Sequence, residues 1–103
     1  MGSYEALFIL TPEIDGEMLE KEIDYLKNEI VKLLGEISES KLLGKRKLAY
    51  SIKKMTDGFY LLINFTCKPD VIDKLLKRIK HDLNVLRVGI FKKDSFSISE
   101  IRD

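Results

Sequence analysis

Cysteine and histidine, two residue types that often carry chemistry, each occur once in this chain, as Cys67 and His81. A tetrahedral zinc site needs about four such ligands. Cys67 has no second cysteine for a disulfide, so we interpret it as a buried structural thiol in a reducing compartment. His81 falls near the end of a predicted helix, where it can interact with the negative helix end. The sequence also lacks a phosphate-binding glycine motif. We therefore expect no catalysis, no metal and no cofactor.

The basic residues form a more informative pattern. Residues 1–40 carry ten acids and three lysines, whereas residues 41–103 carry fifteen lysines or arginines and seven acids, so the net charge of +1 conceals two oppositely charged parts. A basic second part is typical of a surface that binds nucleic acid. An acidic helix that covers and neutralises a basic sheet would explain the division equally well. The candidates for RNA contact are Arg46, Lys47, Arg87, Lys92 and Lys93.

Arg87 is the strongest of these candidates because it interrupts an apolar stretch. A guanidinium buried beneath helices would lack water and partners, and Leu86, Val88 and Ile90 form the better buried set. We therefore expect Arg87 to lie on a sheet face that no helix covers, where RNA phosphates and unstacked bases are suitable partners. For the lysines around Arg46, protection of an edge strand against aggregation is an equally good explanation.

The hydrophobic pattern predicts the elements that must position these side chains. Apolar residues at every third or fourth position predict helices over about residues 15–35 and 70–83. Alternation and short apolar runs predict strands at about residues 4–10, 36–54, 59–67 and 84–93. Gly44 is predicted to mark a bulge in the second strand. The segment from Met55 to Gly58 is predicted to be a hairpin turn, with Gly58 at a positive φ.

The predicted order of strand, helix, strand, strand, helix, strand indicates an α+β fold, the ferredoxin-like βαββαβ sandwich. In this fold a four-stranded antiparallel sheet has two helices on one face, and the first and third strands are central. An open face carrying Leu7, Ile9, Tyr60 or Leu62 would be an exposed apolar patch, which usually marks a binding surface. We expect a single domain over residues 1–103, with an ordered core at about 3–93 and a polar tail at 94–103.

Three groups of residues resemble a known family. They are Tyr4-Glu5 followed by Pro12, Leu43-Gly44-Lys45-Arg46-Lys47-Leu48-Ala49-Tyr50-Ser51-Ile52-Lys53-Lys54 followed by Gly58-Phe59-Tyr60, and Asn84-Val85-Leu86-Arg87-Val88. In this order and spacing they are similar to bacterial small-subunit ribosomal protein 6. The resemblance extends from Tyr4 to the region of Lys93, which is nearly the whole chain.

The resemblance implies a structural component of the bacterial small ribosomal subunit. Such a protein binds the central domain of the small-subunit ribosomal RNA together with ribosomal protein 18. Arg46 and Arg87 match basic positions of the family pattern. The C-terminal tail in this family tends to lie against the partner protein, so Phe96, Ile98 and Ile101 would gain burial only on binding. The predicted interface with the protein partner consists of Tyr60, Leu62, Phe96 and Ile98.

The sequence predicts a cytoplasmic protein. No apolar run approaches the ~20 residues needed to cross a bilayer, and the N-terminus has no basic region before its apolar stretch. We expect the isolated chain to be a monomer. Two other functions stay open. One is a free-standing RNA-recognition module that stacks single-stranded RNA on Tyr60, and the other is a ferredoxin-like regulatory domain that dimerises through its open face.

Overall fold

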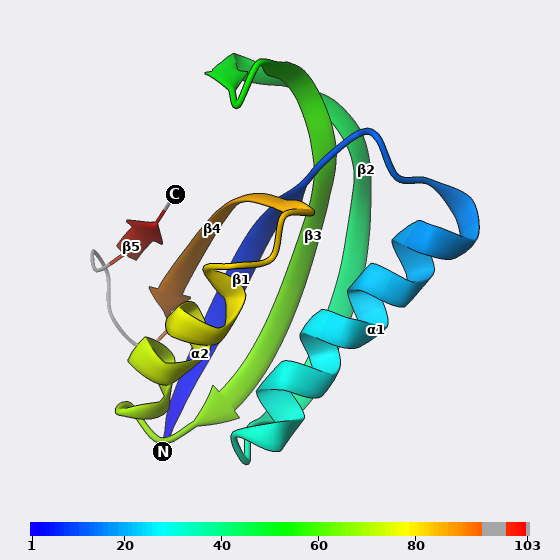
Figure 1. Ribbon diagram of the computed structural model, residues 1–103. Coiled ribbons are helices and arrows are strands. Elements are labelled where there is room, and N and C mark those ends of the chain that lie inside the picture. The colour runs from blue at the N-terminus through cyan, green and yellow to red at the C-terminus, as the bar shows by residue number, and fades with distance from the viewer. Residues whose placement is uncertain (94–98, 103) are drawn as a thin grey trace.

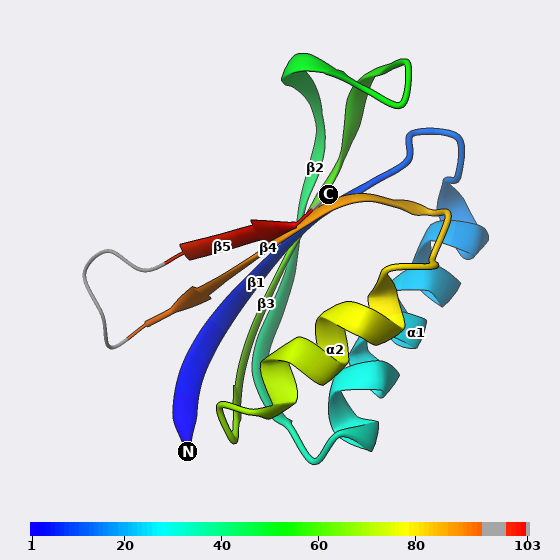
Figure 2. The ribbon, with the colours of Figure 1, turned by 60° about the vertical axis from the view of Figure 1, so that its left-hand side comes forward.

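The computed structural model describes residues 1–93 and 99–102 of the chain. Strands and helices follow the predicted order, with one further strand at the end (Figure 1). The elements are β1 (Gly2–Leu10), α1 (Gly16–Lys32), β2 (Glu36–Ile52), β3 (Met55–Cys67), α2 (Val71–Ile79), β4 (Val85–Lys92) and β5 (Ser99–Arg102). The strands form one sheet in the order β2-β3-β1-β4-β5, and each neighbouring pair is antiparallel. Both helices lie on one face of the sheet (Figure 2). The ferredoxin-like fold with β1 and β3 central is therefore confirmed.

The last strand is an addition to the predicted four-stranded sheet. Ser99–Arg102 pairs with β4, and Ser99 lies opposite Phe91. The sequence pattern placed this segment in a polar tail because four residues are too few to show a reliable period of two. By pairing with β4, the strand β5 covers an edge that would otherwise present unpaired backbone groups. Phe96 and Ile98, two of the predicted partner contacts, lie outside the described residues.

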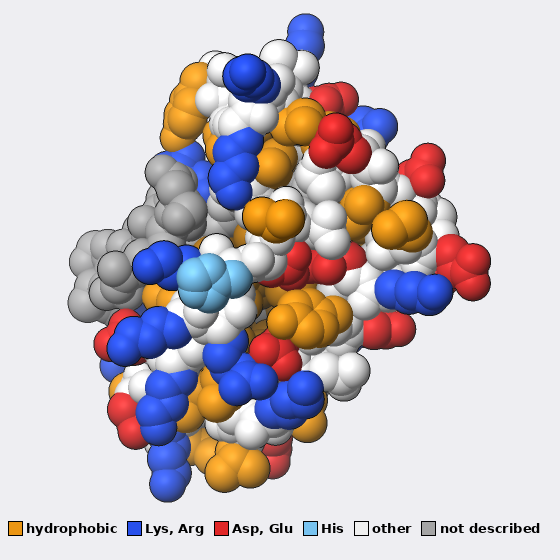
Figure 3. Space-filling model, in the orientation of Figure 1, with side chains coloured by type: hydrophobic (Ala, Val, Ile, Leu, Met, Phe, Trp, Pro, Cys, Tyr) orange, Lys and Arg blue, Asp and Glu red, His pale blue; other side chains and the backbone are white. Residues whose placement is uncertain are grey.

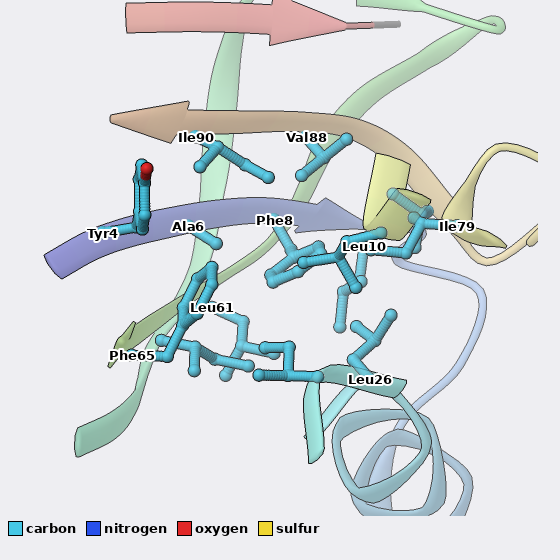
Figure 4. Packing of buried hydrophobic residues seen from close by; sticks show 14 of the residues in the cluster. Tyr4, Ala6, Phe8, Leu10, Leu26, Leu61, Phe65, Ile79, Val88 and Ile90 are labelled. Atoms are coloured by element: carbon cyan, nitrogen blue, oxygen red, sulfur yellow. The ribbon is translucent and has the colours of Figure 1, made fainter. Parts of the chain in front are cut away.

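The hydrophobic core lies between the sheet and the two helices. Alternate residues of β1 and β3 point into it, so that Phe8, Leu61 and Phe65 are almost completely buried. Figure 4 shows Phe8 and Leu10 of β1 pointing toward Leu26 of α1 and Ile79 of α2. Leu83 does not join them, contrary to the helical pattern. It is 85% exposed, because α2 ends at Ile79 and the chain has already left the helix.

The hairpin between β2 and β3 turns three residues earlier than predicted. Ile52 pairs with Met55, and the two residues between them, Lys53 and Lys54, have φ angles of 49° and 68°. A two-residue turn of this kind requires positive φ at both positions, for which Asn and Gly are the usual residues. Two lysines give no such signal, so the sequence indicated Asp57-Gly58 instead. The predicted bulge at Gly44 is confirmed, since its φ is 100° and the β2–β3 register shifts between Leu42 and Gly44.

Gly58 lies inside β3 and not in a turn, contrary to the prediction. Its lack of a side chain allows close packing. A Cβ atom at this position would lie 2.8 Å from the Leu10 carbonyl oxygen and 2.8 Å from Cγ2 of Ile9. It would also lie 3.8 Å from Cδ1 of Leu86. Gly58 therefore lets the end of β1 lie close to β3, and it leaves room for the side chains of Ile9 and Leu86.

Candidate nucleic-acid and partner interface

The strand register defines which side chains share the open face of the sheet. Residues directly opposite each other in an antiparallel pair lie on the same face. Tyr60 lies opposite Ile9, which in turn lies opposite Arg87. Leu62 lies opposite Leu7 in the next row. Their neighbours along each strand point into the core, so these five residues lie on the face away from the helices.

The open face changes in chemical character from one end to the other. At the end where β1 begins, Glu5 and Glu39 flank Asn64, whose Nδ2 donates a hydrogen bond of 3.1 Å to Glu39 Oε1. At the other end Arg46 lies opposite Gly58, and Arg87 lies opposite Ile9. We call this second end, made by Arg46, Tyr50, Gly58, Leu86 and Arg87, the basic end.

A half-buried apolar patch lies between the acidic and basic ends. It consists of Leu7, Tyr60 and Leu62, each partly exposed. Tyr60 and Leu62 are two of the four predicted partner contacts, and they lie two residues apart along β3 on the open face. Apolar side chains that remain accessible on a sheet face without a covering layer usually belong to an interaction surface.

A two-stranded extension of the sheet supplies part of the basic end. β1 ends at Leu10, opposite Phe59, whereas β2 and β3 continue beyond this point to their turn. We call residues 46–58 the hairpin arm. It projects past β1 and curves, as Figures 1 and 2 show. It carries four basic residues and the single acid Asp57.

Arg87 of β4 contacts the hairpin arm across β1 and β3, on the open face of the sheet. Its Nη1 donates a hydrogen bond to the hydroxyl oxygen of Tyr50, and its guanidinium carbon lies 5.6 Å from the centre of the Tyr50 ring. Such a distance is in the range of a cation–π contact. Tyr50 itself is 58% exposed. The arm therefore touches β4, although β3 and β1 separate β2 from β4 within the sheet.

Arg87 lies on the open face, as predicted, but the prediction that Leu86 lies on the opposite face was wrong. Val88 and Ile90 belong to the core under the helices, as expected. Leu86 is also buried, yet it packs near Gly58 and Ile9 on the open face. The cause is a shift of register, because Ile9 pairs with Arg87 whereas Leu10 pairs with Val85. The extra residue puts Leu86 and Arg87 on the same face.

The remaining predicted RNA contacts do not join Arg46 and Arg87. Lys47 lies opposite Asp57, on the face that alternates with that of Arg46. Lys92 lies opposite Tyr4, and the backbone N–H of Lys93 donates to the Ser3 carbonyl at 2.9 Å. Both lysines are thus at the far end of β4 from Arg87. The structure divides the five predicted contacts between the two ends of the molecule.

Sequence reasoning missed two features of the charged surface. Tyr50 is absent from the predicted RNA contacts, although an aromatic residue among lysines and arginines is itself a signal of nucleic-acid binding. The second feature is a group of basic side chains over α2, which Figure 3 shows on the helix side of the molecule. Its members are Lys74, Lys77, Arg78 and Lys80.

Potential metal ligands do not gather anywhere in the part of the chain that the structure describes. Over residues 1–93 no group of three or more His, Cys, Asp or Glu side chains could hold a metal ion. Cys67 is fully buried, as predicted, and burial raises the pKa of its thiol. Among the described helices, none is long and apolar enough to cross a membrane.

These features define a ferredoxin-like α+β domain, with an open sheet face that is apolar in the middle and basic at one end. The family model described as Ribosomal protein S6 matches residues 3–92. The chain is 40% identical over 94 residues to small ribosomal subunit protein bS6 of Caldanaerobacter subterraneus, covering 91% of this chain and 99% of that protein. It is 36% identical over 97 residues to the protein of the same name from Bacteroides fragilis, covering 94% and 85% of the two chains.

A solved structure agrees with this relationship. The crystal structure of 30S ribosomal protein S6 from Thermotoga maritima matches with a TM-score of 0.85 and 29% sequence identity, over 90% of this chain and 88% of that chain. The chain therefore belongs to the ribosomal protein S6 family. This is a family of structural proteins of the small ribosomal subunit and not of enzymes.

Proposed function

We propose that this protein binds the central domain of the small-subunit ribosomal RNA together with ribosomal protein 18, in the small ribosomal subunit of the bacterial cytoplasm. The observation that carries the RNA part is that the strand register puts Arg46 and Arg87 toward the same end of the open face. Guanidinium groups match phosphate oxygens with two parallel hydrogen bonds, which makes arginine well suited to RNA backbones.

The apolar patch of Leu7, Tyr60 and Leu62 supports a protein partner on the same face. A single small module buries only roughly 600–1,000 Å² against nucleic acid, so a second protein that enlarges the interface would strengthen RNA binding. We assign the patch to ribosomal protein 18, and with it Phe96 and Ile98 near the C-terminus. In this arrangement the partner occupies the middle of the face and leaves the basic end to RNA.

We further propose that the isolated chain is a monomer. β5 covers the outer edge of β4 and is itself only four residues long, and a short edge strand is a poor template for strand addition. The opposite edge of the sheet, formed by β2, carries several lysines that repel a second copy, among them Lys41, Lys45 and Lys47. Sedimentation at increasing protein concentration would show a constant mass for a monomer and a rising mass for a dimer.

Binding of a central-domain RNA fragment in the presence of ribosomal protein 18 tests this proposal. Between 50 and 200 mM salt we expect the affinity of the wild-type chain to fall steeply, because phosphate contacts release counterions. Arg46→Ala and Arg87→Ala should each weaken binding and reduce the slope of log affinity against log salt by about 1. Lys92→Ala, at the far end of β4, is the matched control. If Lys92→Ala causes the larger loss, the RNA contact lies at that end instead. If none of the three changes binding, the proposed site is wrong.

A further inference from the structure

The contact between Tyr50 and Arg87 joins two parts of the basic end that the strand pairing leaves apart. Tyr50 comes from β2, at one edge of the sheet, and Arg87 comes from β4, with β3 and β1 between them. The Tyr50 hydroxyl accepts a hydrogen bond from Arg87 Nη1, and the guanidinium lies over the Tyr50 ring at 5.6 Å. Two different groups of one side chain, its hydroxyl and its ring, thus hold the same guanidinium.

Holding an arginine in this way affects what it can bind. A free arginine side chain has several rotatable bonds, and ordering such a side chain on binding costs part of the affinity. A guanidinium that stacks on an aromatic ring keeps its positive charge, which attracts an anionic partner. The same contact fixes the direction in which the guanidinium plane faces.

We propose that Tyr50 is a positioning residue, which holds the Arg87 guanidinium ready to bind one RNA phosphate. This inference rests on the proposed function and assigns a role to a residue outside the predicted RNA contacts. Tyr50 acts through Arg87 and does not itself bind the phosphate. The ring contributes the stacking surface, and the hydroxyl sets the rotation of the guanidinium about it.

A double-mutant cycle measures this coupling directly. The variants are Tyr50→Phe, which keeps the ring and removes the hydroxyl, and Tyr50→Ala, which removes both. Each is combined with Arg87 or with Arg87→Ala, and the dissociation constant for central-domain RNA is measured with ribosomal protein 18 present. We expect Tyr50→Phe to weaken binding about threefold and Tyr50→Ala about tenfold when Arg87 is present. In the Arg87→Ala background neither change should have a further effect, because the group that Tyr50 positions is already gone.

The control and a second readout separate positioning from a general loss of structure. Tyr25→Ala removes another exposed tyrosine, 42% accessible, from α1 on the helix side. It should leave RNA binding unchanged. Thermal unfolding of the Tyr50 variants should stay close to that of the wild type. The salt slope should fall by less than 1 for Tyr50→Phe, since the phosphate contact is weakened and not removed.

Several outcomes would overturn the inference. Equal losses for Tyr50→Ala with and without Arg87 would mean that Tyr50 contacts RNA itself or only supports the fold. Unchanged binding of Tyr50→Ala when Arg87 is present would mean that the contact has no role in recognition. If Tyr25→Ala weakened RNA binding as much as Tyr50→Ala, the effect of Tyr50→Ala would not be specific to the contact with Arg87. Failure of the wild-type chain to bind the RNA at all is a different result, and it would contradict the proposed function itself.

Discussion

Glu22 is a buried acid whose surroundings favour its protonated form. Asn84 Nδ2 donates a hydrogen bond of 3.2 Å to Glu22 Oε1, and the Asn84 backbone N–H donates one of 2.9 Å to Asp82 Oδ1. Oε2 of Glu22 and Oδ2 of Asp82 are both buried and lack a donor among the described residues. Burial, followed by the neighbouring Asp82 carboxylate, raises the pKa of Glu22 to about 8. The protonated Glu22 carboxyl can then donate a hydrogen bond to Asp82, which joins α1 to the loop before β4.

This cluster predicts a dependence of stability on pH. The folded-state pKa of Glu22 lies above its ordinary value of 4.5, so the folded protein keeps a proton that the unfolded chain releases. The stabilising contribution is complete below pH 4.5 and is lost as the pH rises toward 8, at no more than about 1.4 kcal/mol per pH unit. Glu22→Gln, which stays neutral, should flatten this decline in urea unfolding at pH 5, 6.5 and 8.

Glu29 is a suitable control for that experiment, because its pKa is shifted in the opposite direction from that of Glu22. Hydrogen bonding from Arg78 Nε, at 2.8 Å, lowers the pKa of the buried Glu29 carboxyl. Its contribution is therefore present above its ordinary pKa and is lost as the pH falls through the lowered value. Glu29→Gln should leave the decline between pH 5 and 8 intact. A wild-type protein whose free energy of unfolding does not change over this range would contradict the role given to Glu22.

Gly58 allows a second prediction about a single residue. Its missing Cβ would lie 2.8 Å from the Leu10 carbonyl oxygen, a backbone atom that cannot move without disturbing β1. Gly58→Ala should therefore lower the free energy of unfolding by about 1–3 kcal/mol, as overpacking does elsewhere. Ser51→Ala, at an exposed position of the hairpin arm, is a control expected to change stability little. Equal stability of Gly58→Ala and the wild type would show that β1 and β3 can separate here at little cost.

Individual elements show where local sequence determines structure and where it does not. The order of strands and helices follows from hydrophobic periodicity, which is a property of short segments, and it was predicted correctly. The turn at Lys53 and Lys54 was missed because its residues are not the usual ones for positive φ, and β5 was missed because it is short. In both cases tertiary contacts outweigh local preference.

The end of α1 offers a test of local preference. Leu34 follows the helix with a φ of 65° and is 80% exposed. Its left-handed conformation is unfavourable for a residue with a side chain, and burial of the side chain does not offset this cost. Leu34→Gly should raise the free energy of unfolding by about 0.5–1 kcal/mol. Val31→Gly, within the same helix, should lower it, because glycine at a helical position is unfavourable. A loss of stability for Leu34→Gly, measured by urea unfolding, would mean that the Leu34 side chain has a stabilising contact in solution.

At the scale of the whole molecule, the candidate site depends on how distant elements meet. Sequence reasoning placed Arg87 on the open face from its apolar neighbours, and the resemblance singled out Arg46. It could not show that a register shift puts Leu86 on the same face, or that the hairpin arm brings Tyr50 to Arg87. The first depends on the irregular pairing of β4 with β1, and the second on the course of β2 and β3 beyond β1; no short segment specifies either. The separation of Lys92 and Lys93 from Arg87, in contrast, already follows from their places along one predicted strand.

Co-sedimentation with ribosomal subunits tests the central claim most directly, namely that the basic end of the open face attaches this protein to ribosomal RNA. Tagged wild-type chain and the Arg46→Ala, Arg87→Ala double variant are each expressed in cells, and extracts are separated on density gradients at low and moderate salt. We predict that the wild-type chain is recovered with the small subunit at both salt concentrations, whereas the double variant is lost at moderate salt. Equal retention of the double variant, or wild-type chain absent from the small subunit, would contradict the claim.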